Sequence, residues 1–179
     1  MKMQTIDRQP EFAAQRLTLR PLVATDAALV ARHGNDQRIA QMTTAVPFPL
    51  SAEAAEDFVV RAQATDRLED VWAIDGSVSG MAALLGVISL KHIDRDQSEI
   101  NYWVAPAFWN RGYAREAIGA LVRANPHASS SLVACVFQDN PASARVLTAN
   151  GFVHLGDAEA FSLSRGCHVP TWTYLKSLG

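Results

Sequence analysis

The chain has 179 residues, 49% hydrophobic and 19% charged, with a formal net charge of −2 and a pI near 6.2. This composition is typical of a globular protein and excludes a disordered chain, and the weak net charge gives no positive field for nucleic acid or anionic lipid. No apolar run reaches the ~18 residues of a membrane helix, and the two cysteines and polar N-terminus show neither a disulfide framework nor a signal peptide. We therefore expect one cytoplasmic domain over residues 1–179, with neither a nucleic-acid nor a membrane partner.

The first third of the chain predicts one strand and two helices. Apolar and polar residues alternate over 16–21, which predicts a strand ended by a proline. Helices over 25–33 and from 51 to about 63 or 65 each begin at a residue with a capping hydroxyl. The two prolines within 47–50 exclude regular helix between them.

From about residue 70 the pattern changes to short apolar segments joined by turns. Three strands, at 71–74, 82–90 and 98–104, predict an antiparallel meander. The later elements are predicted as helix, strand, helix and two strands, at 112–124, 132–137, 141–149, 152–161 and 167–176. This mixed order predicts an α/β (α+β) fold around one mostly antiparallel sheet flanked by helices.

The stretch FWNRGYAREAIGAL at 108–121 is the first candidate binding motif. Gly112 can adopt a positive φ and lets a ligand approach the backbone, while the helix behind it presents unpaired N–H groups. Arg111 and Arg115 flank this positive helix end, where cations are unfavourable unless an anion is bound. The pattern favours a diphosphate held by backbone amides. The alternative is a simple turn with two solvated arginines.

A second candidate motif begins at Asn140. Asn140 suits a helix N-cap, Pro141 the first helical position and Gly151 the residue after the helix, so this segment has a complete structural explanation. Ser143 lies about one turn into the helix, at the same end as Asn140.

Together these segments resemble the GNAT superfamily of acyl-CoA-dependent N-acyltransferases. That family places Gln/Arg-x-x-Gly-x-Gly/Ala between a strand and a helix, and later has Asn-x-x-Ser/Ala and a closing Gly-Phe. The matching segments here are WNRGYA at 109–114, NPAS at 140–143 and GF at 151–152. The segments RLTLRP at 16–21 and EINYWV at 99–104 look like the RimJ/RimL-type branch.

Two residues depart from the family pattern. Trp109 stands where Gln or Arg is usual, a variation that the RimJ/RimL-type branch tolerates. Leu147 stands where many members carry a tyrosine general acid, so that role is vacant or filled by another group.

The resemblance implies a sheet of six to seven strands, splayed between 99–104 and 132–137 to hold acetyl-CoA. The N–H of Val104 would polarise the thioester carbonyl, and Asn140 would hydrogen-bond the pantetheine arm. The diphosphate would be held by the loop and first helical turn, formed by Trp109, Asn110, Arg111, Gly112, Tyr113, Ala114 and Arg115.

The resemblance also suggests two side chains for the chemistry. Glu99 lies where histone acetyltransferases of this superfamily carry their general base, and the alternative is a solvated glutamate at a strand start. Ser143 would contact the cofactor and protonate or orient the departing thiolate, and the alternative is an exposed serine. We expect no metal, since no cluster of His, Cys, Asp and Glu has metal-ligand spacing.

The expected activity is an N-acetyltransferase that moves the acetyl group of acetyl-CoA directly to a primary amine in a ternary complex. The acceptor would be a protein N-terminal amine or a small-molecule amine, and a homodimer is kept open. The alternative function is a catalytically weak or inactive GNAT-like domain that binds CoA as a sensor or scaffold.

Overall fold

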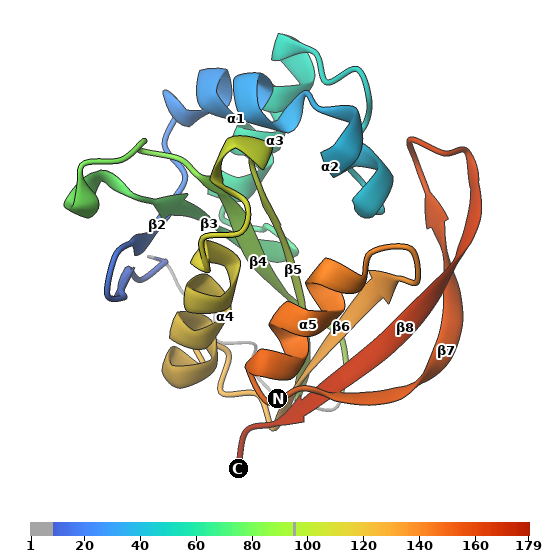
Figure 1. The fold of residues 1–179 in the computed structure, drawn as a ribbon. Coiled ribbons are helices and arrows are strands. Elements are labelled where there is room, and N and C mark those ends of the chain that lie inside the picture. The colour runs from blue at the N-terminus through green and yellow to red at the C-terminus, as the bar shows by residue number, and fades with distance from the viewer. Residues whose placement is uncertain (1–8, 95) are drawn as a thin grey trace.

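A single open sheet forms the centre of the computed structural model, which describes residues 9–94 and 96–179 (Figure 1). The eight strands lie in the order β1-β2-β3-β4-β5-β6-β8-β7, and every neighbouring pair is antiparallel except β5 and β6. The strands are β1 (Phe12–Ala13), β2 (Thr18–Pro21), β3 (Glu69–Asp75), β4 (Gly86–His92), β5 (Gln97–Val104), β6 (Ser131–Phe137), β7 (Val153–Ser162) and β8 (Cys167–Ser177).

Helices cover both faces of this sheet. They are α1 (Asp26–Gly34), α2 (Gln37–Met42), α3 (Ala52–Gln63), α4 (Tyr113–Ala124) and α5 (Pro141–Ala149), with short 3-10 turns η1 (Ser77–Ser79) and η2 (Pro106–Phe108). One apolar core lies under α4 and includes Ile88, Ile100 and Ile118. A second core lies under α1 and α3 and includes Val30, Val59 and Val87. The sheet therefore has two separately buried faces.

The predicted fold class is confirmed, with eight strands where six to seven were expected. The extra strand is β1, which has two residues and too little pattern to be predicted. Helix α2 was also missed, because it has six residues and no clear apolar period. No helix within the described ranges is long and apolar enough to cross a membrane.

Helix caps follow the predicted chemistry in one case and depart from it in another. The side chain of Ser51 accepts a hydrogen bond from the N–H of Ala54 at 3.1 Å, as an N-cap serine should. Thr25 makes no side-chain cap bond to α1. Asp26, the first residue of that helix, accepts from the N–H of Val23 instead, at 2.8 Å.

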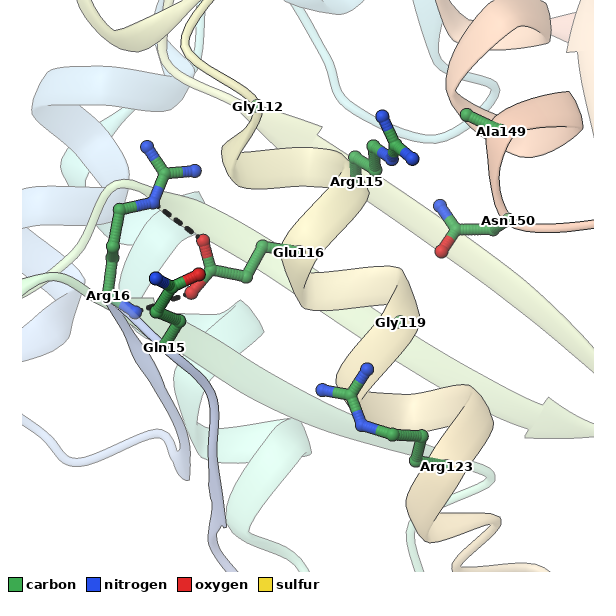
Figure 2. Close-up of a pocket in the computed structure, with 9 residues that line it drawn as sticks. All are labelled: Gln15, Arg16, Gly112, Arg115, Glu116, Gly119, Arg123, Ala149 and Asn150. Atoms are coloured by element: carbon green, nitrogen blue, oxygen red, sulfur yellow. Dashed lines mark hydrogen bonds and ion pairs between the residues drawn. The ribbon is translucent and has the colours of Figure 1, made fainter.

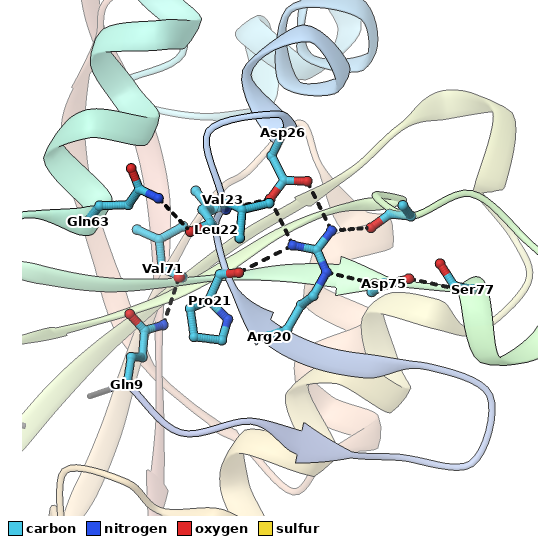
Figure 3. Close-up of polar contacts among 11 residues, drawn as sticks. Gln9, Arg20, Pro21, Leu22, Val23, Asp26, Gln63, Val71, Asp75 and Ser77 are labelled. Atoms are coloured by element: carbon cyan, nitrogen blue, oxygen red, sulfur yellow. Dashed lines mark hydrogen bonds and ion pairs between the residues drawn. The ribbon is translucent and has the colours of Figure 1, made fainter.

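Arg20 joins the second strand to three other parts of the chain (Figure 3). Its guanidinium donates to both carboxylate oxygens of Asp26, at 2.8 and 2.9 Å, and to Asp75 at 2.7 Å. It also donates to the carbonyl of Ala83 at 2.8 Å. Asp26 is only 3% exposed at its side chain, so this guanidinium compensates a buried carboxylate charge.

Candidate acyl-transfer site

Strands β5 and β6 pair only at one end and then diverge. The parallel ladder joins Gln97 to Ser131, Ser98 to Leu132 and Glu99 to Val133, and it ends there. Strand β5 nevertheless continues to Val104 and β6 continues to Phe137. The two strands therefore form a V whose open end lies between the later residues of each strand.

The backbone of Val104 presents a hydrogen-bond donor to this opening. On the other edge of β5, the N–H of Ala105 donates to the carbonyl of Leu85 at 2.8 Å. Because successive N–H groups of a strand point to opposite edges, the N–H of Val104 points away from β4 and toward the diverging β6. It lies beyond the last β5–β6 pair, so it is placed to donate to an oxygen in the opening.

Trp109 fixes the end of β5. Its indole N–H donates to the carbonyl of Val104 at 2.6 Å, and the guanidinium of Arg38 from α2 lies 5.4 Å from the indole centroid. The family resemblance places Trp109 in the loop that would hold the diphosphate, and this contact adds a role at the end of β5. Trp109 therefore bonds the carbonyl of Val104, the residue whose N–H points toward the opening between β5 and β6.

The loop after η2 has the backbone that an anion site needs. Asn110 and Gly112 adopt positive φ values of 60° and 81°, and α4 begins directly afterwards. Gly112 is the N-cap, so no side chain of that residue caps the free N–H groups of the first turn. Tyr113 is buried, and only its backbone is available to a ligand. Arg111 and Arg115 are exposed beside this helix end.

Arg16 is part of this site, although the sequence placed it only in a strand. It precedes β2 and donates to the carbonyl of Arg111 at 2.9 Å. Its Nε also donates to Glu116 at 2.8 Å, and its guanidinium lies 4.6 Å from the ring centroid of Tyr113. Glu116 is therefore paired with Arg16, which leaves the charge of Arg115 uncompensated by that carboxylate.

A groove of about 510 Å³ runs along the outer side of α4 (Figure 2). It is lined by Gln15, Arg16, Gly112, Arg115, Glu116, Gly119, Arg123, Ala149 and Asn150. Arg115 and Arg123 are eight residues apart, which places them about two turns from each other on one helix face. The groove holds three arginines against one glutamate, so its charge suits a ligand with several phosphates.

The start of α5 closes the other side of the V. Asn140 caps the helix, with its side chain accepting from the N–H of Ser143 at 3.3 Å. The Oγ atom of Ser143 lies 2.5 Å from the phenol oxygen of Tyr102 on β5. Leu147 is completely buried in the core under α4 and α5, so no polar group occupies its position.

Glu99 and Val104 lie at different ends of the opening. Glu99 belongs to the last β5–β6 pair, and five residues of strand place it about 16 Å from Val104. Its side chain shares a sheet face with Trp103, which packs in the core under α1 and α3. Partial burial of the sulfur, and then the charge of Glu99, raise the pKa of the Cys135 thiol on β6, although Cys135 as a whole is exposed.

Comparison with known proteins identifies the fold. Residues 16–153 match the family model of the acetyltransferase (GNAT) domain. The chain belongs to the GNAT acetyltransferase family. No curated protein sequence matches this chain.

Solved GNAT structures share the architecture at low sequence identity. The ribosomal L7/L12 alpha-N-protein acetyltransferase RimL, solved with coenzyme A, is 18% identical with a TM-score of 0.80, covering 94% of this chain and 98% of RimL. The microcin C7 self-immunity acetyltransferase MccE, solved with acetyl-CoA and AMP, is 18% identical with a TM-score of 0.78, covering 91% and 93%. A chimera of the spermidine N-acetyltransferase SpeG from Vibrio cholerae and hSSAT is 19% identical with a TM-score of 0.74, covering 92% and 96%. These identities show the shared fold and assign no branch within the GNAT family.

The structure places the predicted site residues at several points along β5, α4 and α5. Gly112 and Arg115 line the groove beside α4, and Val104 lies at the end of β5, where it accepts from Trp109. Ser143 contacts Tyr102 of β5, whereas Glu99 belongs to the last β5–β6 pair. His33 was not predicted as a site residue. Its ring centroid lies 5.8 Å from that of Phe108, the last residue of η2, which follows β5. Burial, followed by the charge of Arg32, lowers the pKa of His33, which keeps the imidazole neutral at pH 7.

Proposed function

We propose that this GNAT protein transfers the acetyl group of acetyl-CoA directly to a primary amine in a ternary complex. The observation that carries the proposal is the divergence of β5 and β6 beside an arginine-flanked helix N-terminus. Beyond Glu99 and Val133 the two strands no longer bond each other, so a thin ligand arm could bond their backbone groups, and the helix end would provide donors for its phosphates. The mechanism requires no metal and no covalent intermediate on the protein.

The residues that line the loop and groove fit the phosphate-bearing part of acetyl-CoA. A Cβ on Gly112 would meet only the movable guanidinium of Arg16, at 3.3 Å, so the backbone at Gly112 is accessible to a ligand. The first-turn N–H groups of α4 and the side chains of Arg111 and Arg115 would hold the diphosphate, with Asn140 assisting at the pantetheine arm. When bound, acetyl-CoA supplies an acetyl thioester that amines can attack.

Three groups of the protein would act on the charges that form during acetyl transfer, at the carbonyl oxygen, the sulfur and the amine. The N–H of Val104 would stabilise negative charge on the carbonyl oxygen, and Ser143 would stabilise the departing sulfur. The attacking amine must be neutral and must lose a proton, for which we propose Glu99 as general base. Because Glu99 lies about 16 Å from Val104 along the strand, it would receive the proton through intervening water molecules.

The acceptor would approach from the face opposite to α4 and α5. On that side the tip of the β7–β8 hairpin is joined to α2: the guanidinium of Arg165 donates to the carbonyl of Gln41 at 3.0 Å, and the N–H of Leu163 donates to the carbonyl of Thr44 at 3.0 Å. We propose an amine of the kind that RimL or SpeG is named for, a protein N-terminus or a small-molecule amine. An acceptor of the RimL kind would place this chain in the RimJ/RimL-type branch.

Acetyl-CoA should raise the melting temperature of this protein. At a concentration 100 times the Kd, native-state binding adds about 2.7 kcal/mol, which corresponds to about 5–11 °C for a chain of this size. Differential scanning fluorimetry measures the shift, and thiol release with a panel of amines and N-terminal peptides measures turnover. No shift at millimolar acetyl-CoA contradicts the proposal. A shift without thiol release from any amine supports the CoA-binding sensor or scaffold.

Replacement of Glu99 by glutamine should lower kcat by about 100-fold, the lower range for loss of a general base, and leave acetyl-CoA affinity unchanged. The reason is that glutamine keeps the shape of the side chain but cannot accept the proton. Glu159→Gln on the exposed edge strand β7 provides the matched control. A kcat equal to that of the wild type across pH 6–9 removes Glu99 from the mechanism and makes His33 the next residue to replace.

A further inference from the structure

A tyrosine and a serine from opposite arms of the V contact each other across it. The phenol oxygen of Tyr102 lies 2.5 Å from Ser143 Oγ and 3.3 Å from the carbonyl oxygen of Ser143. Tyr102 is on β5, three residues beyond the last pair with β6, and Ser143 is in the first turn of the helix that follows β6. The contact therefore joins the two diverging elements at the level of the opening.

The chemistry of the two hydroxyls decides which one donates. Burial raises the pKa of Tyr102 to about 12, although the hydrogen bond with Ser143 acts in the opposite direction. The phenol is therefore neutral at physiological pH and keeps its proton. Either oxygen could donate in the 2.5 Å contact, and the phenol hydrogen has the Ser143 carbonyl oxygen at 3.3 Å as a second acceptor. Because a phenol is more acidic than an aliphatic alcohol, we assign it as the donor of the shorter contact, with the serine oxygen as acceptor. With its oxygen engaged as acceptor, Ser143 has its own hydrogen free to point elsewhere.

Ser143 is the residue of α5 that offers a polar side chain to Tyr102. Leu147, one turn further along the helix, is completely buried and apolar. Asn140 uses its side-chain oxygen to cap the N–H of Ser143. The serine backbone is thus held by the cap and its side chain by the tyrosine, which fixes both ends of the short side chain.

We propose that Tyr102 is a positioning residue for acetyl transfer, donating its O–H to Ser143 Oγ so that the Ser143 O–H is directed at the sulfur of the thioester. This inference rests on the proposed function. In the reaction, the amine electron pair forms the C–N bond and the C–S bond breaks with its electrons leaving on sulfur. The amine passes one proton to the base. The thiolate is stabilised by the Ser143 hydrogen bond and takes one proton from water, and the base later releases its proton to water, so protons and electron pairs balance.

Replacement of Tyr102 by phenylalanine tests the inference. We expect kcat to fall about tenfold, the effect of losing one hydrogen bond in the transition state, with the KM for acetyl-CoA unchanged within about twofold. Tyr174→Phe is the matched control, because it removes another phenol oxygen from the same core without touching Ser143. Its kcat should equal that of the wild type.

A double-variant cycle separates positioning through Ser143 from a general structural role. In the Ser143→Ala background, Tyr102→Phe should cause no further loss of kcat, whereas in the Ser143→Thr background, which keeps a hydroxyl, the loss should return. A tenfold loss that is unchanged in the Ser143→Ala background overturns the inference, as does an equal loss in Tyr174→Phe.

The same measurements distinguish failure of this inference from failure of the proposed function. If the wild type shows the thermal shift with acetyl-CoA and releases thiol, but Tyr102→Phe retains full kcat, only the role of Tyr102 is overturned. If the wild type neither binds acetyl-CoA nor releases thiol, the proposed function falls and this inference falls with it. A thermal shift with acetyl-CoA that is equal in wild type and variants shows that the folded site is intact in each.

Discussion

Replacement of Gly86 by alanine is expected to destabilise the protein by about 3 kcal/mol, the upper end of the usual range for overpacking, and to abolish most of its acetyl transfer. A Cβ at this position would lie 2.0 Å from the carbonyl oxygen of Trp103 and 2.8 Å from the Cα of Val104. Both atoms belong to the backbone of β5, so no side-chain rotation relieves the clash. Strand β5 would have to move away from β4, and the Val104 N–H would move with it.

Thermal unfolding and thiol release together measure this effect. A loss of 3 kcal/mol corresponds to a fall in melting temperature of about 6–12 °C for a chain of this size. Gly156→Ala is the control, because a Cβ at Gly156 in β7 has no neighbour within 4 Å, and its stability should change by less than about 0.5 kcal/mol. A Gly86→Ala protein with the melting temperature and kcat of the wild type would show that β5 accommodates the methyl group, contrary to this expectation.

Replacement of Arg20 by methionine should cost about 3–5 kcal/mol of stability, the range for removing one partner of a buried ion pair. Methionine keeps much of the apolar stem of arginine but removes every donor. The carboxylate of Asp26, 3% exposed, would then be buried without its cation, and the carbonyl of Ala83 would lose its donor. Arg61→Met provides the control, since Arg61 lies exposed on α3.

The pH dependence of unfolding gives a second measure of the same network. Burial alone would raise the pKa of Asp75, but hydrogen bonds from Ser77 and Arg20 outweigh it and lower that pKa below 3.8. A carboxyl group with a lowered folded-state pKa contributes stability above its unfolded pKa and loses it as pH falls through the folded value. Between pH 5 and 3, the wild type should therefore lose more stability at this site than Arg20→Met. Equal pH dependence would contradict the assignment of this shift to Arg20.

Elements were predictable where local chemistry defines them. The helix over 141–149 was predicted with its final bounds, because an asparagine cap, a proline at the first position and a glycine beyond the end all lie within twelve residues. Helix α2 has a local cap, because the Asp36 side chain accepts from the N–H of Arg38 at 2.8 Å, but it has neither a proline at its start nor a glycine at its end. Distant residues also bind it: Ser164 Oγ donates to the carbonyl of Ala40 at 2.8 Å, and Arg165 donates to the carbonyl of Gln41.

The candidate site likewise contains residues that local motifs predict and residues whose contacts only the fold creates. Gly112 and Ser143 stand in short motifs that the sequence displays, so their place was predictable. The contacts of Arg16 with Glu116 and of Tyr102 with Ser143 join residues 100 and 41 positions apart, and no local pattern encodes them. The sequence shows that Glu99 and Val104 are five residues apart on one strand. Only the structure shows that the β5–β6 ladder ends at Glu99, so that Glu99 is paired with β6 and Val104 is not.

A continuous sheet separates the two layers of helices that cover its faces. Where β5 and β6 diverge, no backbone hydrogen bonds join the strands, so a ligand could contact both layers there. A bisubstrate molecule that joined CoA to an amine would pass through the sheet, with its nucleotide half beside α4 and its amine half beside α2 and the β7–β8 hairpin. The two halves would contact separate cores of the protein. Changes that alter amine preference can then accumulate in one layer while the acetyl donor continues to be recognised by the other.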